Sequence, residues 1–149
     1  MRSVVQRVDR AKVLISDQRI SEIGKGLLVL LGIEREDRES DADYLSEKIM
    51  NLRIFEDESK KMNLSLIDIR GEMLVVSQFT LLGDCRRGRR PSFTAVENPN
   101  RARILCDYFI RRTKEIIGHV AEGEFQAMML IELTNNGPVT ILLDSRRIF

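Results

Sequence analysis

The chain of 149 residues contains no tryptophan, one histidine and two cysteines, and aromatic residues make up only 5% of it. So few aromatic side chains argue against a platform on which the bases of a single-stranded nucleic acid stack. His119, Cys85 and Cys106 form no ligand cluster, so we expect no metal. No spacing links His119 to a nucleophile, so a Ser-His-Asp or Cys-His hydrolase is poorly supported.

A dominant charge and a long apolar run are also missing. The net charge is +1, so any contact with RNA must come from a local basic patch. The longest apolar stretch, residues 26–33, is far too short to span a bilayer, and the N-terminus lacks the apolar segment of a secretory signal. With only two cysteines, both expected to be free thiols, the chain fits a cytoplasmic protein without membrane association.

Strands are expected before and after a helical middle part. The continuous apolar run at residues 27–31 predicts a central strand covered on both faces. Alternating apolar residues predict further strands. They are expected at residues 4–8 and 11–15, joined by a turn at Asp9 and Arg10, at 64–69 and 73–82, and in a C-terminal hairpin of 125–133 and 139–143.

Two helices are expected between these strands. The first begins near Ser40, which forms a capping box with Asp43. The second begins after Asn98, has Pro99 as its first residue and ends at Gly118. The residues expected to be buried are Ala42, Leu45, Ile49 and Leu52 in the first helix, and Leu105, Phe109 and Ile116 in the second.

This order of elements predicts an α/β fold. We expect a single domain, residues 1–149, with a mixed, largely antiparallel and barrel-like β-sheet and two main helices packed on one of its faces.

Residues 77–82 place polar side chains inside an apolar strand, where they need partners. The segment is therefore either a hydrogen-bonded ladder between strands or a site. In a strand, Ser77 and Phe79 would face one side and Gln78 and Thr80 the other, and backbone N–H groups at the strand end could stabilise an oxyanion. No G-x-S-x-G motif surrounds Ser77. A hydrolase built on this segment would take its reactive group from the substrate or from an ordered water.

Residues 135–140 read locally as the turn of a hairpin. Pro138 cannot donate to a ladder, so it marks an edge or the start of the last strand. The cis isomer occurs in only about 5–6% of X-Pro bonds and is not predicted by the sequence. The tip of the turn, with Asn136, Gly137 and Pro138, would project from its sheet, where a partner subunit could receive it.

A basic loop and a C-terminal apolar segment complete the candidate residues. Four arginines of the loop, Arg86, Arg87, Arg89 and Arg90, suit phosphate or the RNA backbone. They equally suit a solvated surface, because Asp84 and Glu97 are close enough in sequence to pair with them. Phe125 and Met129 indicate core packing, although methionine can also lie against a flat ring.

Taken in order, residues 1–8, 77–81, 90–93 and 136–140 resemble the D-aminoacyl-tRNA deacylases, also called D-tyrosyl-tRNA deacylases. The resemblance spans the whole chain. It implies a cytoplasmic homodimer without metal or cofactor that hydrolyses the ester between a D-amino acid and the 3′-terminal ribose of tRNA. It also implies activity on glycyl-tRNA.

The resemblance assigns roles to the candidate residues. Ser77, Gln78, Phe79 and Thr80 would line the pocket, and Phe125 and Met129 would hold the terminal adenosine. Gly137 and a cis Pro138, with Asn136 beside them, would reach into the pocket of the other subunit. Their carbonyls would crowd an L side chain and spare a D side chain.

Two mechanisms remain open at this point. Thr80 could attack as a nucleophile, or the ribose 2′-OH could assist while the protein positions the ester. We favour the second, because no base adjoins Thr80, and we expect oxyanion donors in the N–H groups of Phe79 and Thr80. Two other functions also remain: an RNA-binding module without enzymatic activity, and a hydrolase of small acyl esters.

Overall fold

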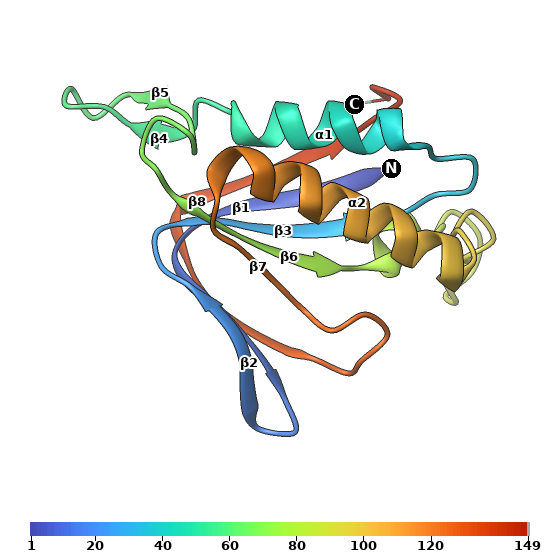
Figure 1. Cartoon of the computed structure of the whole chain (residues 1–149). Coiled ribbons are helices and arrows are strands. Elements are labelled where there is room, and N and C mark those ends of the chain that lie inside the picture. The colour runs from blue at the N-terminus through green and yellow to red at the C-terminus, as the bar shows by residue number, and fades with distance from the viewer. Residues whose placement is uncertain (149) are drawn as a thin grey trace.

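The computed structural model describes residues 1–148, apart from the side chain of Arg19. The elements in chain order are β1 (Arg2–Ile15), β2 (Gln18–Ile23), β3 (Gly26–Gly32), α1 (Glu39–Met50), β4 (Phe55–Glu56), β5 (Met62–Leu64), β6 (Glu72–Ser77), the 3₁₀ helix η1 (Phe79–Leu82), α2 (Pro99–Ile117), β7 (Val120–Glu122) and β8 (Leu130–Asp144). Both long helices lie on the same side of β1, β3 and β6 (Figure 1).

The main sheet is mixed, and its ends approach each other. Its strand order is β2-β1-β3-β6-β7, with β8 also paired to β1. β1 runs antiparallel to β2, β3 and β8, whereas β3–β6 and β6–β7 are parallel pairs. The Ser21 hydroxyl on β2 donates a hydrogen bond of 2.8 Å to the carbonyl of Glu122 on β7. The predicted fold, a mixed and nearly barrel-shaped sheet with two helices, is confirmed.

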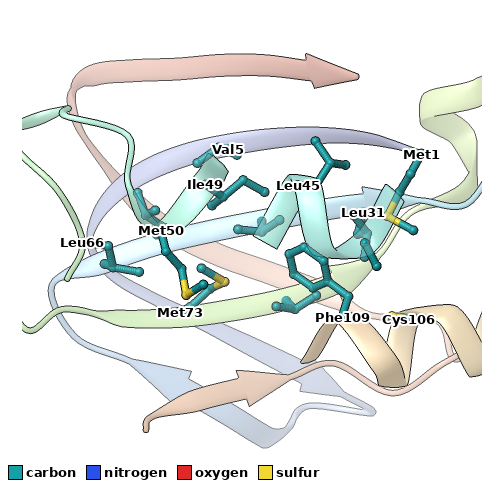
Figure 2. Packing of buried hydrophobic residues seen from close by; sticks show 14 of the residues in the cluster. Met1, Val5, Leu31, Leu45, Ile49, Met50, Leu66, Met73, Cys106 and Phe109 are labelled. Carbon is teal, nitrogen blue, oxygen red and sulfur yellow. The ribbon is translucent and has the colours of Figure 1, made fainter. Parts of the chain in front are cut away.

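Apolar side chains cover both faces of the central strand β3. Leu27 belongs to a core cluster between sheet and helices, where Leu45 and Phe109 are fully buried (Figure 2). Leu28 points the opposite way, into a second cluster with Val8 and other residues on the inner face of the curved sheet. Successive side chains of a strand face opposite sides, so a continuous apolar run fits this doubly covered position, as predicted.

Helix α2 has the predicted ends. The side-chain oxygen of Asn98 accepts the N–H of Arg101 at 3.1 Å, and Pro99 is the first helical residue. Gly118 ends the helix with φ +77°, a value that favours glycine. The prediction that Ile116 is buried is wrong: its side chain is 51% exposed, because Ile117 packs against the core at this turn.

We expect Asn98→Ala to lower the free energy of unfolding by about 1 kcal/mol, since the N–H of Arg101 loses its capping acceptor. Urea denaturation would measure the change. Asn100→Ala is the matched control, because Asn100 lies within the first turn of α2 and is not its cap. Equal midpoints for the two variants would contradict a capping role for Asn98.

Helix α1 begins with a different residue pair from the predicted one. The cap position is Arg38, whose N–H donates to the Asp41 carboxylate at 2.8 Å. Asp43 instead accepts hydrogen bonds from the side chains of Tyr108 and Arg112 on α2, so it is not available to the helix end. The predicted buried residues Ala42, Leu45 and Ile49 are confirmed, and Leu52 follows the helix and packs partly buried against the core.

Several predicted strand boundaries are wrong. β1 is one strand through Asp9 and Arg10, because β8 pairs with it on both sides of this point. Residues 65–71 form a turn held by Ser65 and Asp68, whose side chains lie 2.7 Å apart, and the strand there is limited to β5. No hairpin forms at residues 125–143: β8 is a single strand interrupted by a bulge.

The bulge in β8 lies opposite Arg7. Gln6 pairs with Thr140 and Val8 pairs with Asn135, so residues 136–139 face a single residue of β1. A bulge of this kind redirects the chain locally without ending the strand. Within residues 1–148, no helix combines the length and apolarity required to cross a membrane.

Candidate active site

A cavity of about 700 Å³ lies where β6 ends, between η1, the start of α2 and the segment that precedes β8. Its lining includes Ser77, Gln78, Phe79, Phe93, Phe125 and Met129. The structure thus brings together two groups predicted separately from the sequence, the polar segment at 77–79 and the pair Phe125 and Met129. Of the predicted catalytic residues, Thr80 is not part of this lining.

The polar segment leaves the sheet at Ser77. Ser77 pairs with Leu31 of β3, and the N–H of Gln78 donates to the Leu31 carbonyl at 2.8 Å. The chain then turns into η1, so the predicted strand 73–82 is five residues too long, and the alternation of faces expected for residues 77–80 does not continue past Ser77. Leu82, the last residue of this turn, is buried.

The 3₁₀ turn begins with two backbone N–H groups that make no hydrogen bond within it. Its first hydrogen bond is made by the N–H of Leu81, which donates to the Gln78 carbonyl at 3.3 Å. The N–H groups of Phe79 and Thr80 precede this bond, and the first N–H groups of a helix have no partner within it. Such groups are suited to bind a carbonyl oxygen or an oxyanion.

Thr80 lies exposed on η1. Its hydroxyl accepts a short hydrogen bond from the side-chain amide of Gln78. In the part of the chain that the structure describes, no histidine, lysine or carboxylate is hydrogen-bonded to this hydroxyl. The local geometry therefore provides no base that would activate Thr80.

Two phenylalanines form one wall of the cavity. The rings of Phe79 and Phe93 meet edge to face, with centroids 5.2 Å apart and an interplanar angle of 71°. Both remain substantially exposed, at 54% and 38%. With Met129 and Phe125 in the same lining, the cavity offers apolar surfaces that suit a flat ring.

The Gly137–Pro138 peptide bond is cis and lies in the bulge of β8. Arg7, nearly buried, donates from Nε to the Asn136 carbonyl at 3.1 Å and from Nη1 to the Ile54 carbonyl. The sequence interpretation did not include Arg7. Its position in the sequence could have indicated its burial, because Arg7 lies two residues after the buried Val5 and so faces the same interior side of β1.

Further hydrogen bonds fix both ends of the bulge. The amide of Asn135 donates to the carbonyls of Arg7 and Val139, each at 3.0 Å. The amide of Asn136 donates to the Asp9 carboxylate at 2.7 Å. The segment is therefore held on both sides of Gly137, whose φ of +118° favours glycine.

Within one chain the bulge is remote from the cavity. Ser77 is level with Leu31, Ser3 and Leu143 across the sheet, whereas Gly137 lies about four residues further along and three strands away. With about 3.3 Å per residue and 4.8 Å per strand, the separation is roughly 20 Å. One chain thus brings Ser77 together with Phe125 and Met129, but not with Gly137.

The arginine loop is exposed. Arg86 donates to both oxygens of Asp84, at 2.9 and 2.7 Å, and these hydrogen bonds lower the pKa of Asp84 to about 2. Among residues 1–148, Arg87, Arg89 and Arg90 make no ion pair. Of the two acidic residues close enough in sequence to pair with the loop, Asp84 does so, whereas Glu97 pairs with Arg101 at 3.5 Å.

A more open groove of about 970 Å³ runs along α2 and shares Ser77 and Phe125 with the cavity. Cys106 lies in its lining, and burial raises the pKa of this thiol to about 12, so it stays protonated near neutral pH. Over residues 1–148, no three side chains of His, Cys, Asp or Glu gather as a group that could hold a metal ion.

Known proteins match this chain over its full length. The profile of the D-Tyr-tRNA(Tyr) deacylase family matches residues 4–144. A D-aminoacyl-tRNA deacylase of Syntrophus aciditrophicus (strain SB) is 64% identical over 149 residues, covering all of both chains. That of Clostridioides difficile (strain 630) is 57% identical with the same coverage.

Solved structures share the fold. One described as c-Myc DNA Unwinding Element Binding Protein aligns with a TM-score of 0.92 and 39% identity, over 97% of this chain and 98% of the other. A probable eukaryotic D-amino acid tRNA deacylase aligns with a TM-score of 0.84 at 18% identity, over 96% of this chain and 98% of the other, which is a likeness of fold alone.

The fold and these full-length matches define the class of protein: a hydrolase that acts on ester bonds. Within this class, the chain belongs to the D-aminoacyl-tRNA deacylase family.

Proposed function

We propose that this protein hydrolyses the ester that joins a D-amino acid to the 3′-terminal ribose of tRNA, releasing the free D-amino acid and tRNA, and that glycyl-tRNA is also a substrate. The observation that carries the proposal is the cavity at the end of β6, which joins Ser77, Gln78 and Phe79 to Phe125 and Met129. Membership of the family supports the same substrate.

The cavity suits the end of an aminoacylated tRNA. Phe125 and Met129 provide apolar surface for the terminal adenine, and Ser77 and Gln78 supply polar contacts beside it. The N–H groups of Phe79 and Thr80, at the start of η1, are the donors for the oxyanion that forms on the ester carbonyl.

Water is the attacking group in this proposal. It adds to the ester carbonyl carbon and releases one proton, the tetrahedral intermediate then breaks its bond to the ribose 3′-oxygen, and this oxygen takes up the proton. The neighbouring ribose 2′-OH assists this proton transfer, and the protein contributes positioning and oxyanion donors. The exposed position of Thr80, without a base, supports a mechanism in which this residue is not the nucleophile.

Selection against L-amino acids requires a second copy of the chain. The Gly137–Pro138 segment lies roughly 20 Å from Ser77 within one chain, by strand spacing. We therefore place the Gly137–Pro138 segment of the partner subunit in the cavity, in a cytoplasmic homodimer. Its carbonyls exclude an L side chain, a D side chain points outward, and glycine, without a side chain, escapes exclusion.

The arginine loop is the proposed contact for tRNA phosphates. Arg87, Arg89 and Arg90 have no ion pair among residues 1–148, which leaves them available for phosphate oxygens. Arg86 instead fixes the loop through Asp84.

We expect Thr80→Ala to retain at least about a third of the kcat/KM for D-tyrosyl-tRNA, because the mutation removes a hydroxyl but keeps the backbone N–H. Initial rates of amino acid release would measure it. Thr140→Ala is the matched control, since Thr140 is an exposed threonine on β8. Near-complete loss in a folded Thr80→Ala variant alone would establish Thr80 as the nucleophile and contradict the proposed mechanism.

The direct test of the function is to incubate the protein with D-tyrosyl-tRNA and L-tyrosyl-tRNA in parallel and follow release of tyrosine. Hydrolysis of the D ester, with the L ester spared, is expected. Binding of tRNA without cleavage of either ester would favour the RNA-binding module. Cleavage of minimal esters without a need for RNA would favour the hydrolase of small esters.

A further inference from the structure

A further cleft lies beside the cavity, at the start of α2, and three of its five lining residues are arginines. It has a volume of about 490 Å³ and is lined by Arg38, Arg101 and Arg146, with Glu36 and Asp41. Arg101 and Ala102 are consecutive residues of α2: Ala102 lines the cavity and Arg101 lines the cleft. The two spaces are therefore separated only by the first turn of this helix.

Two of the three arginines are held in place by the protein. Arg101 donates from Nη2 to the Asp37 carbonyl at 3.0 Å. Arg146 donates from Nη2 to the Arg35 carbonyl at 2.8 Å, and its Nη1 lies 3.6 Å from the Glu34 carboxylate. Guanidinium groups oriented in this way lose little freedom when they bind an anion, since each has further N–H donors.

The third arginine is unpaired. The exposed Arg38 side chain makes no hydrogen bond or ion pair within the described residues 1–148. The nearby Asp41 carboxylate is already engaged by the N–H of Arg38 at 2.8 Å. An arginine left free in a cleft with two oriented arginines is available to a ligand with several acceptor oxygens, such as a phosphate group.

We propose that this cleft binds a backbone phosphate of the tRNA 3′ strand, just before the terminal nucleoside that occupies the cavity. The inference rests on the proposed function. A helix is about 10 Å across, so a strand that enters the cavity can pass around the start of α2 and reach the three arginines. The partial positive charge at this helix N-terminus favours a phosphate along the same path.

The variant that tests the cleft is Arg38→Gln, because Arg38 stabilises nothing else among the described residues. Arg70→Gln is the matched control: Arg70 is an exposed arginine that precedes β6, at the opposite end of this strand from the cavity, and it lines neither the cavity nor the cleft. We would measure the Kd for deacylated tRNA over a range of salt concentrations. We would also measure kcat/KM for D-tyrosyl-tRNA and for D-tyrosine esterified to adenosine alone, a substrate too short to reach the cleft.

Arg38→Gln is expected to raise the Kd for tRNA about fivefold at low salt and to reduce the slope of log K against log salt concentration by about 0.7, as for one lost phosphate contact. The kcat/KM for D-tyrosyl-tRNA should fall by about the same factor, and that for the adenosine ester by less than about twofold. Arg70→Gln should leave all three values near those of the unmodified protein.

If Arg38→Gln leaves the Kd for tRNA unchanged, the cleft does not bind a phosphate of the tRNA. The proposal is also overturned if kcat/KM falls equally for the adenosine ester, because this result would indicate a disturbed cavity. Failure of the proposed function looks different. The unmodified protein could cleave neither ester while Arg38→Gln still weakens tRNA binding and reduces the salt slope. This result would support phosphate binding in the cleft and contradict the proposed deacylase activity.

Discussion

Gly137→Ala is expected to lower the kcat/KM for D-tyrosyl-tRNA about 100-fold, because displacement of a positioning segment by about 1 Å can cost this much. A Cβ at residue 137 would lie 2.7 Å from Nη2 of Arg7 and 2.8 Å from Cγ2 of Val139. The φ of +118° is also unfavourable for alanine. Since Arg7 and Val139 are both fixed by hydrogen bonds to the bulge, the new methyl group must displace the Gly137–Pro138 segment itself.

Gly118→Ala separates this effect from simple backbone strain. Gly118 has φ +77°, but a Cβ there would meet nothing within 4 Å. It should cost about 1 kcal/mol of stability, as expected for a helix end, and leave hydrolysis unchanged. Single-turnover hydrolysis of D- and L-tyrosyl-tRNA would compare the Gly137→Ala and Gly118→Ala variants. Thermal unfolding would check that both variants are folded. Full activity in a folded Gly137→Ala variant would show that the segment takes no part in catalysis or selection.

The sequence predicted the elements whose local signals agree with their tertiary surroundings. Helix α2 is the best case, since Asn98, Pro99 and Gly118 mark its ends independently of anything else in the fold. The central strand β3 is another, because a continuous apolar run fits only a position covered on both faces.

The errors fall where long-range pairing overrides local preference. Asp9 and Arg10 are typical of a turn, yet they lie within β1 because β8 supplies a partner along nearly the whole strand. Residues 136–139 are also typical of a turn, and the chain does turn there, but as a bulge that returns to the same partner strand. Sequence patterns cannot distinguish a hairpin from a bulge when the identity of the partner strand is unknown.

The candidate site was predictable only in part, because its assembly also depends on long-range pairing of strands. Residues 77–79 stood out because their polar side chains interrupt an apolar strand, and their meeting with Phe125 and Met129 depends on the sheet order. The arginines of the cleft are far apart in sequence, at positions 38, 101 and 146, and only the fold brings them together. The loop arginines, by contrast, were visible as a run but are not in the lining of the cavity that contains the polar segment.

Arg7→Gln is expected to lower the kcat/KM for D-tyrosyl-tRNA by about 10- to 100-fold and the Tm by about 5 °C. Arg7 is 5% exposed and donates to the carbonyls of Asn136 and Ile54, which lie on different parts of the chain. Glutamine is too short to reach both. An unpaired buried carbonyl costs about 1–3 kcal/mol, so the loss of either bond destabilises the bulge. The segment that follows Asn136 is then free to move away from the position proposed for it in selection against L-amino acids.

Arg10→Gln is the matched control, because Arg10 lies on the same strand, and its bond to Thr134 at 3.3 Å is exposed. Arg7→Gln and Arg10→Gln should differ in kcat/KM and in Tm, with both values for Arg10→Gln close to those of the unmodified protein. The ratio of D- to L-tyrosyl-tRNA hydrolysis is the informative quantity, since loss of stability alone lowers both rates together. A fall in the ratio for Arg7→Gln assigns Arg7 a positioning role in selection, whereas an unchanged ratio would limit it to supporting the fold.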